Sequence, residues 1–436
     1  MTKCYHHSIE FSSLKRRKVS VTFEGGEITS DGGVLLLREI DKQTGLTEAI
    51  NKAFKDTRHQ SYCTHSQLTL IRQRIFGLAL GYEDLNDHDH LRHDGAIQTA
   101  SGKLGTLGSS PTLCRLEQRA DKHSAFALHA VMVDQFIESY THPPKKLVLD
   151  FDATHDPVHG EQEGRHFNAF YDTYCFLPLY VFCGNRMLTS YLRPSSCGAA
   201  HHAGAVLKLL VERLRKVWPK VKIVFRADAG FCKPLILNWC DRHGVDYVVG
   251  LSKNSVLTRK SEVIRALSES MYRLEEKAQK RFTEFRYSAR SWPHKRRIIV
   301  KSEFNSLGEN TRYVVTSLSS RPKTLYEVDY CQRGDMENRI KEQKSLFSDR
   351  TSCHDWWPNQ LRLLFTSFSY MLIEALRRNC LHETELACAQ VRTVQLKLFK
   401  IGGIITRNTR SIKLMLSSNY PYQYLFSKVA DTLNSG

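Results

Sequence analysis

Residues 330–344, YCQRGDMENRIKEQK, carry four functional groups at a regular spacing. On an α-helix of 3.6 residues per turn, Tyr330, Arg333, Glu337 and Lys344 fall at about 0°, 300°, 340° and 320° around the axis. A phenol, a guanidinium, a carboxylate and an ammonium would therefore share one face. That face is too polar for a core, so it is either a solvated face with ion pairs at helical spacing or part of a functional site.

Two further acids stand at the ends of predicted strands. Asp152 closes the run KLVLDFDAT, and Asp228 closes VKIVFRAD. In α/β sheets, ligands bind in the crevice at the carboxyl ends of the strands, although a single Asp after a strand is more often a turn residue or a helix cap. Asp150 is a rival for Asp152, because residues two apart on a strand point to the same side. Asp152 is favoured because it lies nearer the end of the strand.

Three carboxylates meeting at one place need neutralisation. Asp152, Asp228 and Glu337 would repel one another unless divalent cations lay between them, and hard oxygen ligands suit Mg²⁺, with Mn²⁺ as a substitute. Two such ions, roughly 3.5 to 4 Å apart, can hold the attacking and leaving oxygens of an in-line displacement at a phosphodiester. The three acids therefore predict a site for phosphoryl transfer.

The charge balance points to a polyanionic partner. Lys and Arg number 63 against 45 Asp and Glu in 436 residues, a net charge of +18. The basic residues are scattered along the chain, which favours nucleic acid over an anionic membrane surface. Binding to DNA should therefore weaken as the salt concentration rises.

The remaining composition is that of a globular protein expected to be soluble and cytoplasmic. The 12 cysteines include no C-x-x-C pair, so they are read as reduced thiols rather than zinc ligands or a redox pair. The basic run at 15–18 stands where a signal peptide would need apolar residues. The most apolar stretch, 361–376, contains Arg362 and Glu374 and is predicted to be a buried helix rather than a membrane span.

The first part of the chain, residues 1–143, is predicted to be a basic helical module. Helical periodicity appears at 66–81 and 124–140, and Ser110-Pro111 or Thr112 could open another helix. Between these patterns, EDLNDHDHLRHD (83–94) holds three histidines and four aspartates. It could be a metal site, a network that connects helices or a solvated face, because spacing alone does not make a coordination shell.

The second part is predicted to be an α/β sheet with an insertion. Strands at 146–154, 176–184 and 186–192, a helix at 203–217, a strand at 221–228, a helix at 233–243 and a strand at 246–251 form its first half, 144–254. Residues 255–322 form an insertion, helical to 280 and β-rich from 281. The second half, 323–400, begins with a helix for which Thr324 and Glu327 have capping-box spacing. Residues 401–436 contain a hairpin at 404–416 and a helix from 421.

The spacing Tyr-x2-Arg-x3-Glu-x6-Lys resembles the Y-R-E-K signature of a branch of bacterial insertion-sequence transposases, which have a DDE site on an RNase H-like fold. The segments FEGGEITSDGGVLLLREID, GYEDLNDHD, LRHD, SSPTLCRLE, DFDATHDPVHGEQEG and FRADAGF resemble one subgroup, in the same order along nearly the whole chain. The resemblance implies an RNase H-like catalytic core, interrupted by the β-rich insertion and preceded by a helical DNA-binding module.

The resemblance also implies roles for individual residues. Asp152, Asp228 and Glu337 would be the catalytic acids and would hold two Mg²⁺ or Mn²⁺ ions. The residues that would contact DNA phosphates are Tyr330, Arg333, Lys341 and Lys344. Trp292, which is the one Trp in the insertion, is a candidate to stack on a displaced base; alternatively it is a packing residue beside Pro293.

The activity implied is cutting of DNA at terminal inverted repeats, followed by attack of the freed 3′-OH on target DNA. The N-terminal module would recognise the repeats, and a homodimer would assemble on paired DNA ends in the bacterial cytoplasm, at the nucleoid, without a membrane. Two alternatives remain at this point: a metal-dependent nuclease of the same fold, and a DNA-binding regulator with a decayed site.

Overall fold

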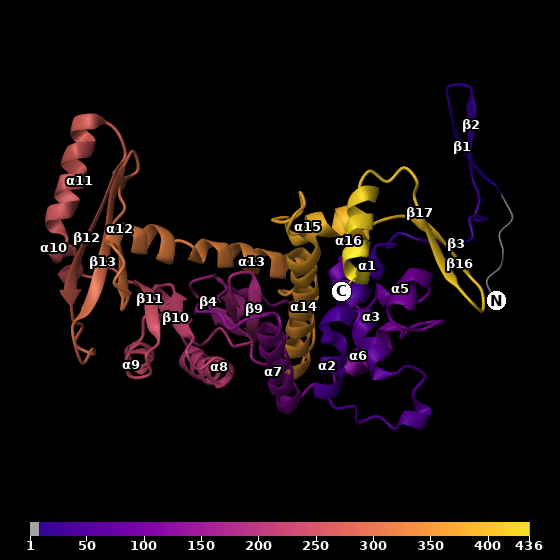
Figure 1. The fold of residues 1–436 in the computed structure, drawn as a ribbon, viewed down its shortest axis with the longest axis horizontal. Coiled ribbons are helices and arrows are strands. Elements are labelled where there is room, and N and C mark those ends of the chain that lie inside the picture. Colours follow the sequence, from indigo (N-terminus) through magenta and orange to yellow (C-terminus); the bar gives the residue numbers. More distant parts are fainter. Residues whose placement is uncertain (1–7, 436) are drawn as a thin grey trace. The chain divides into compact units, whose positions relative to one another are not determined.

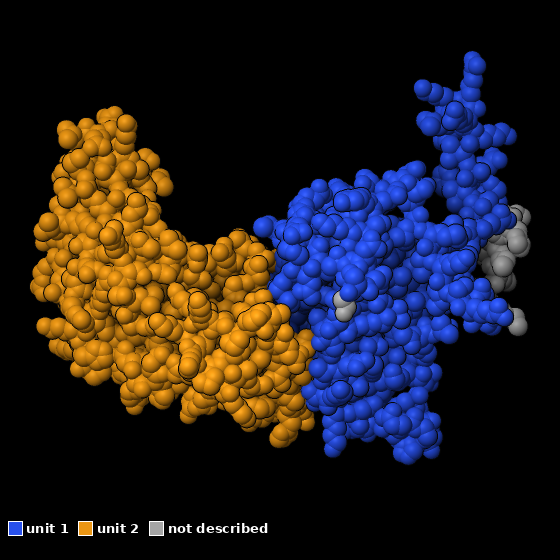
Figure 2. All heavy atoms as spheres, viewed as in Figure 1, with its two compact units in different colours: residues 1–120, 345–347, 368–436 blue, residues 121–344, 348–367 orange. Residues whose placement is uncertain are grey.

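The computed structural model describes residues 8–435, which divide into two compact units (Figure 2). Unit 1 comprises the chain up to Ala120 together with 345–347 and 368–436, and unit 2 comprises 121–344 and 348–367. These boundaries differ from the predicted ones at two places. Residues 121–143 belong to unit 2, because helix α7 (Lys122–Glu138) buries Val133 and Phe136 in the core of that unit. Residues 368–400 belong to unit 1, with the C-terminal hairpin and helix.

Unit 1 is mainly helical, with short strands. Its elements are β1 (Ile9–Leu14), β2 (Arg17–Val21), β3 (Glu27–Thr29), α1 (Val34–Thr44), α2 (Leu46–Ala53), η1 (Gln60–Tyr62), α3 (Gln67–Leu80), α4 (His88–Leu91), α5 (Gly95–Ala100), α6 (Ser110–Glu117), η4 (Arg377–Leu381), α15 (Val391–Val394), η5 (Gln395–Phe399), β16 (Gly403–Arg407), β17 (Ile412–Leu416) and α16 (Gln423–Ser435). The helices predicted at 66–81 and from 421, and the hairpin at 404–416, are confirmed.

Helix α3 is the centre of unit 1. Its N-cap, Ser66, accepts a hydrogen bond from the backbone N–H of Thr69, and Gly81 ends it in the left-handed conformation. Nearly every side chain of the helix is buried, and it contacts α1, α2, α5 and α6. A helix that is buried on all sides is typical of a core helix rather than a surface one.

Two hairpins flank the helices of unit 1. Strands β16 and β17 pair antiparallel, and β3 adds to β16 as a third strand. Strands β1 and β2 form a separate, fully exposed hairpin, and the basic run 15–18 spans its turn and the start of β2. Lys15 has a φ of 57° at this turn. The run is therefore presented on a β-hairpin rather than on a helix.

The pair Gly32-Gly33 allows two backbone segments of unit 1 to approach closely. The N–H of Gly33 donates to the carbonyl of Phe399 at 3.1 Å. A Cβ at Gly33 would lie 1.8 Å from the carbonyl oxygen of Leu398. Since this is far inside van der Waals contact, only glycine fits there. The neighbouring acid, Asp31, is buried and pairs with Lys400 at 2.7 Å.

Unit 2 is built around one mixed sheet, with the strand order β12-β13-β15-β11-β10-β4-β8-β9 (Figure 1). These strands span β4 (Lys146–Ala153), β8 (Leu179–Cys183), β9 (Arg186–Tyr191), β10 (Lys222–Ala227), β11 (Asp246–Leu251), β12 (Gln279–Tyr287), β13 (Arg296–Asn305) and β15 (Arg312–Thr316); β14 (Gly308–Glu309) pairs with β13. Strands β4, β10 and β11 are parallel. The predicted α/β sheet is confirmed.

The two faces of this sheet carry different side chains. Odd-numbered residues of β4 and β10, such as Phe151 and Phe225, lie in the main apolar core with residues of α7, α8 (Ala203–Val217) and α9 (Pro234–Arg242). Because strand residues alternate between faces, the even-numbered residues, which include Asp150 and Asp152, point to the opposite face. In Figure 1, α13 (Arg333–Ser345) runs along that second face, above the sheet, and α7, α8 and α9 lie below it.

The β-rich insertion extends the central sheet instead of forming a separate piece. Strand β15 pairs antiparallel with β11, and β13 and β12 follow in order. Ile298 and Val300 of β13 enter the main core, and Ile299 enters a smaller core on the other face, with Leu325. Helices α10 (Ser255–Lys260) and α11 (Glu262–Glu275) precede these strands, and α11 contacts β12 and β13.

Proline residues account for two errors in the predicted elements. The strand predicted at 176–184 is split at Pro178, which has no N–H to donate to a sheet. Phe176 therefore ends β7 (Thr173–Phe176), in a small sheet with β5 (Asp156–Pro157) and β6 (His166–Asn168). Pro322 starts α12 (Pro322–Thr324) early, at a position where proline is favoured. Thr324 is consequently inside the helix, and the predicted capping box is wrong.

Helix α12 continues into the π-helical turn η3 (Leu325–Tyr330) and then α13, and α14 (Trp356–Leu376) follows. None of the helices within residues 8–435 combines the length and apolar character needed to cross a bilayer. The cysteines of this described part are all free thiols.

The close approach at Gly33 gives a stability test. Its φ of −74° suits any residue, so Gly33→Ala is blocked only by the contact with the Leu398 carbonyl. We expect the substitution to lower the free energy of unfolding by about 3 kcal/mol, measured by urea denaturation with circular dichroism. Gly105→Ala is the control, because nothing lies within 4 Å of a Cβ there. Equal midpoints for the two variants would contradict the close approach.

Candidate active site

Asp152 and Asp228 lie level on neighbouring parallel strands. Strands β4 and β10 pair in one unbroken register that ends with Phe151 opposite Ala227. The next step of that register places Asp228 beside Asp152, and Asp228 still has extended backbone, with φ −77° and ψ −176°. Both side chains therefore belong to the face along which α13 runs.

Asp150, the rival for the strand-end position, is held in a buried ion pair. Arg226 Nη2 donates to Asp150 Oδ2 at 2.7 Å, and Arg226 Nε donates to the other carboxylate oxygen. Burial raises the pKa of Asp150, and Arg226 opposes that rise. Arg226 also donates to the carbonyl of Asp329 at 2.7 Å. This pair thus ties β4 and β10 to η3, and it leaves Asp152 as the more accessible acid of the strand.

Arg333 bridges an acid of the sheet and an acid of the helix. Its Nη1 donates to Asp152 Oδ2 at 3.1 Å, and its Nη2 donates to Glu337 Oε1 at 2.9 Å. The side chains of Arg333 and Asp152 are 19% and 13% exposed, while Glu337 is 51% exposed. The predicted helix face is therefore turned toward the strand ends, and its outer side is open to solvent.

The pKa of Asp152 shows that the three acids share one electrostatic environment. Burial raises this pKa from 3.8 to about 6; the charge of Arg333 opposes the rise, and the charges of Asp228 and Glu337 add to it. Arg333 is the cation whose charge opposes this rise in the pKa of Asp152. The structure thus gathers Asp152, Asp228 and Glu337, which come from three distant segments, around one guanidinium.

Tyr330 occupies space left by a glycine. A Cβ at Gly250 would lie 2.8 Å from the Tyr330 hydroxyl and 2.8 Å from the backbone nitrogen of Ala229. Burial raises the pKa of Tyr330; Arg333 lowers it and Asp228 raises it further. The sequence patterns described above did not single out Gly250. Its signal was a glycine in an otherwise apolar strand, DYVVGL, which often marks close approach of another group.

Lys344 lies at the other end of α13 and contacts the segment that follows β4. Its Nζ donates to the carbonyl of His155 at 2.8 Å and lies 3.9 Å from Asp156 Oδ1. Asp156 is fully buried, and burial raises its pKa well above the usual range, against the charge of Lys344. Arg333 and Lys344 therefore place two cations of one helix along the same chain segment.

The two remaining predicted DNA contacts differ from each other. Lys341 is exposed on α13. Trp292 is only 8% exposed and belongs to the main core. Its ring packs against Tyr287, with centroids 5.6 Å apart, and the Arg296 guanidinium lies 4.9 Å from it. This burial agrees with the packing alternative and leaves no free face on Trp292 for a base.

Exposed aromatic rings beside the acids were also missed in the sequence. Phe167, Phe170, Tyr171 and Tyr174 lie on the hairpin formed by β6 and β7. Burial raises the pKa of Tyr171, and the charges of Asp152, Cys175 and Asp228 raise it further. The available signal was the aromatic density of HFNAFYDTY, a short polar segment with four large rings.

The His and Asp residues at 83–94 form a network between helices rather than an ion site. His88 is fully buried; its ring lies 3.3 Å from Gln73 Nε2, and it fills the space beside Gly77. Burial lowers its pKa to about 3. Asp89 accepts a hydrogen bond from the N–H of Ser110 at 3.0 Å. His88 is thus a buried neutral imidazole and Asp89 an acceptor for a backbone N–H, and these two residues connect α4 with α3 and α6.

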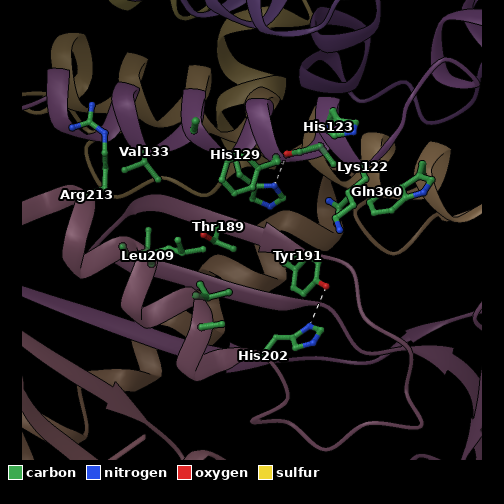
Figure 3. Close-up of a pocket in the computed structure, with 17 residues that line it drawn as sticks. Lys122, His123, His129, Val133, Thr189, Tyr191, His202, Leu209, Arg213 and Gln360 are labelled. Carbon is green, nitrogen blue, oxygen red and sulfur yellow. Dashed lines mark hydrogen bonds between the residues drawn. The ribbon is translucent and has the colours of Figure 1, made fainter. Parts of the chain in front are cut away.

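An apolar cavity of unit 2 has a volume of about 770 Å³ and lies between α7, α8 and β9 (Figure 3). In the close-up, the Tyr191 hydroxyl reaches His202 Nδ1, at 3.1 Å. Val133 and Leu210, which line the cavity, also belong to the main core. The cavity therefore adjoins the face of the sheet opposite to α13, and no carboxylate lines it.

The donor chemistry of the three acids fits a hard divalent cation. As the side chains stand in residues 8–435, no group of three His, Cys, Asp or Glu residues is arranged around one ion position, and Arg333 provides the positive charge between Asp152 and Glu337. Carboxylate oxygens are the preferred ligands of Mg²⁺ and Mn²⁺. A cation among the acids would relieve the repulsion that raises the pKa of Asp152.

The fold and these side chains define an α/β protein with an acidic centre at the ends of parallel strands, faced by a helix that carries Arg333 and Lys344. Residues 11–435 match the family model described as transposase DDE domain group 1. Because the match covers nearly the whole sequence, the chain belongs to this family of DDE transposases. It is thus a transposase by class, and transposases bind DNA and generally use divalent metal ions.

Other comparisons add little beyond the family. One similar solved structure is the piggyBac transposase synaptic complex with hairpin DNA, determined by cryo-electron microscopy. It is 12% identical, with a TM-score of 0.43, and the alignment covers 85% of this chain and 80% of that chain. No curated protein matches the sequence.

The two aspartates of β4 should respond oppositely to neutralisation. The pKa of Asp152, about 6 in the folded protein, exceeds its usual 3.8, so the folded state binds the proton more tightly and stability falls as pH rises through this window. Asp152→Asn should therefore raise the free energy of unfolding by about 2 kcal/mol at pH 7.5 in EDTA, and by much less at pH 4. Asp150→Asn should lower it by about 3 kcal/mol, because Arg226 stays buried without its counter-charge.

Urea denaturation of both variants at the two pH values measures these changes. A loss of stability for Asp152→Asn at pH 7.5 would show that Asp152 is a structural acid like Asp150.

Proposed function

We propose that this protein is the DNA transposase of an insertion sequence, of the bacterial Y-R-E-K branch, and that it cuts at terminal inverted repeats and joins the 3′-OH ends to target DNA. The observation that carries the proposal is the bridge from Asp152 through Arg333 to Glu337, with the charge of Asp228 beside it. Three acids from one sheet and one helix, with a phosphate-binding cation among them, suit chemistry on a phosphodiester.

The strand arrangement supports an RNase H-like core. The antiparallel strands β9 and β8 are followed across the sheet by the parallel strands β4, β10 and β11. Asp152 lies near the end of the first strand of this core in the sequence, Asp228 follows the next parallel strand, and Glu337 is on the helix that runs along the acidic face. We assign the family's three catalytic acids to these positions.

Asp152, Asp228 and Glu337 are the residues that would hold Mg²⁺, or Mn²⁺, at this site. When bound, two such ions would lower the pKa of an attacking water and stabilise the charge on the phosphodiester oxygens. Arg333 has a second role, because a guanidinium pairs with phosphate as well as with carboxylate. The guanidinium that offsets the negative charge of the acids can thus also hold the DNA backbone beside them.

The other residues of α13 and η3 position the DNA. The Tyr330 hydroxyl, held over Gly250, can donate to a phosphate oxygen, and Lys344 and exposed Lys341 add positive charge along the same helix. These contacts are made to backbone phosphates, so they position the strand without selecting its sequence. Water attacks in the first step and the freed 3′-OH attacks in the second, so no side chain of the protein becomes covalently attached to DNA.

Recognition of the terminal repeats is assigned to the N-terminal part of unit 1. The β1–β2 hairpin presents the basic run 15–18 fully exposed, which suits contact with phosphates. A homodimer on paired ends, acting at the bacterial nucleoid in the cytoplasm, completes the proposal.

Glu337→Gln tests the assignment of the third acid. It should reduce cleavage of DNA that flanks the protein's own gene by about a hundredfold or more in Mg²⁺, because one ligand and one charge are lost from the site. Binding of the same DNA should change by no more than about twofold. Asp335→Asn is the matched control, since it removes an exposed carboxylate from the same helix. An unimpaired cut rate for Glu337→Gln would refute the assignment.

The same assay separates a transposase from a nuclease. DNA with pre-cut 3′-OH ends is incubated with a target plasmid and Mg²⁺, and the wild-type protein should join the two. Hydrolysis of the ends without joining would favour the nuclease, whereas footprints without any nicking in Mg²⁺ or Mn²⁺ would favour a regulator.

A further inference from the structure

The hairpin of β6 and β7 exposes an unusual group of aromatic side chains. Phe170 is 87% exposed, Phe167 is 52% exposed and Tyr174 is 48% exposed. Phe167 and Tyr174 are direct partners across the two strands, and Phe170 lies in the turn between them. Contiguous apolar groups of this kind on a surface indicate a binding site.

The backbone that carries these rings is fixed. The Asn168 side chain accepts a hydrogen bond from the N–H of Phe170 at 3.0 Å and donates to the carbonyl of Ser195 at 3.0 Å. Ser195 Oγ in turn donates to the carbonyl of His166 at 2.8 Å. The first side of the turn is therefore held by side-chain hydrogen bonds, which lowers the entropic cost of presenting the rings.

The rings lie next to the proposed active site. Strand β7 pairs with Asp156 and Pro157, which follow directly after β4 and its Asp152. The Tyr171 ring stacks on His155, with centroids 4.2 Å apart and an interplanar angle of 18°. The charges of Asp152 and Asp228 reach Tyr171, where they add to the effect of burial in raising its pKa.

The ring geometry leaves Phe170 with a free face. Phe170 meets Tyr171 edge-on, with centroids 4.9 Å apart at 90°, so Tyr171 covers only one side of it. Tyr171 is itself backed by His155. The row His155, Tyr171, Phe170 therefore ends in an exposed ring on a rigid support, which is how an aromatic side chain accepts a further flat group.

We propose that Phe170, supported by Tyr171, stacks on an unpaired base of the DNA strand that enters the acidic centre. This inference rests on the proposed function for its choice of ligand. Every base has an aromatic face, so the contact is independent of sequence, and it requires the base to be unpaired because paired bases are covered by their neighbours.

Charge favours a nucleic acid strand over an apolar protein segment at this place. The Arg165 guanidinium lies 4.9 Å from the Tyr174 ring, and Lys344 contacts the carbonyl of His155. Cations interleaved with exposed rings are the arrangement that binds single strands, because the cations follow the phosphates while the rings take the bases. The net charge of +18 also favours a nucleic acid strand.

The test compares three substitutions in the full-length protein by fluorescence anisotropy. The probes are a 20-base-pair duplex with a single-stranded extension of six thymines at one end, and the blunt duplex, both in EDTA. Phe170→Leu should weaken binding of the extended duplex by about tenfold and leave the blunt duplex unchanged, while Phe170→Trp should bind both probes as the wild type does. Phe126→Leu is the control, because Phe126 is 67% exposed but lines the apolar cavity on the other face.

A fluorescent adenine analogue, 2-aminopurine, placed in the extension gives an independent reading. Its fluorescence should be quenched on binding to wild type and to Phe170→Trp, and much less on binding to Phe170→Leu. Equal affinities and equal quenching for wild type and Phe170→Leu would overturn the proposal. Both measurements are made without metal and without cleavage, so they test the stacking of Phe170 even if the protein cuts no DNA. A failure to cut DNA would instead count against the proposed function.

Discussion

The acidic face of unit 2 depends on one electrostatic constraint: three carboxylates are crowded beside one guanidinium. Parallel pairing of β4 and β10 forces Asp152 and Asp228 to the same level, and α13 adds Glu337. Burial, with the charges of Asp228 and Glu337 added to it, raises the pKa of Asp152 to about 6. Arg333 opposes that rise in the folded protein. A site where buried carboxylates lie beside a guanidinium is suited to bind cations and a polyanion together.

The surrounding structure is arranged to maintain this crowding. The Asp150–Arg226 pair fixes the two strands to η3, and Gly250 leaves room for the Tyr330 hydroxyl beside Asp228. The insertion strands β15, β13 and β12 continue the sheet, so they stiffen the same layer that carries the acids. The aromatic hairpin is attached to the first residues after β4. Each of these features is set by where β4, β10 and β11 end.

Much of the fold was predictable because local periodicity decided it. The helix at 203–217 and the strand at 246–251 have the predicted ends. The hairpin lies at 404–416, as the sequence predicted. Errors occurred where a single proline overrode a longer pattern, at Pro178 and Pro322. The unit boundaries could not be predicted, because they depend on which core buries α7 and on where residues 368–400 pack.

The sequence by itself determined which residues could do chemistry: the spacing of Tyr330, Arg333, Glu337 and Lys344 put them on one helix face, and the strand ends marked Asp152 and Asp228. Tertiary structure alone decided their partners. Asp150 and Asp152 point to the same side of one strand, yet only Asp150 meets Arg226, because that pairing depends on the register between two strands 76 residues apart. The sequence likewise left Trp292 open as a stacking residue or a packing residue, and it is buried because the insertion joins the main sheet. Periodicity is a local property of the chain, whereas register and burial depend on contacts between distant segments.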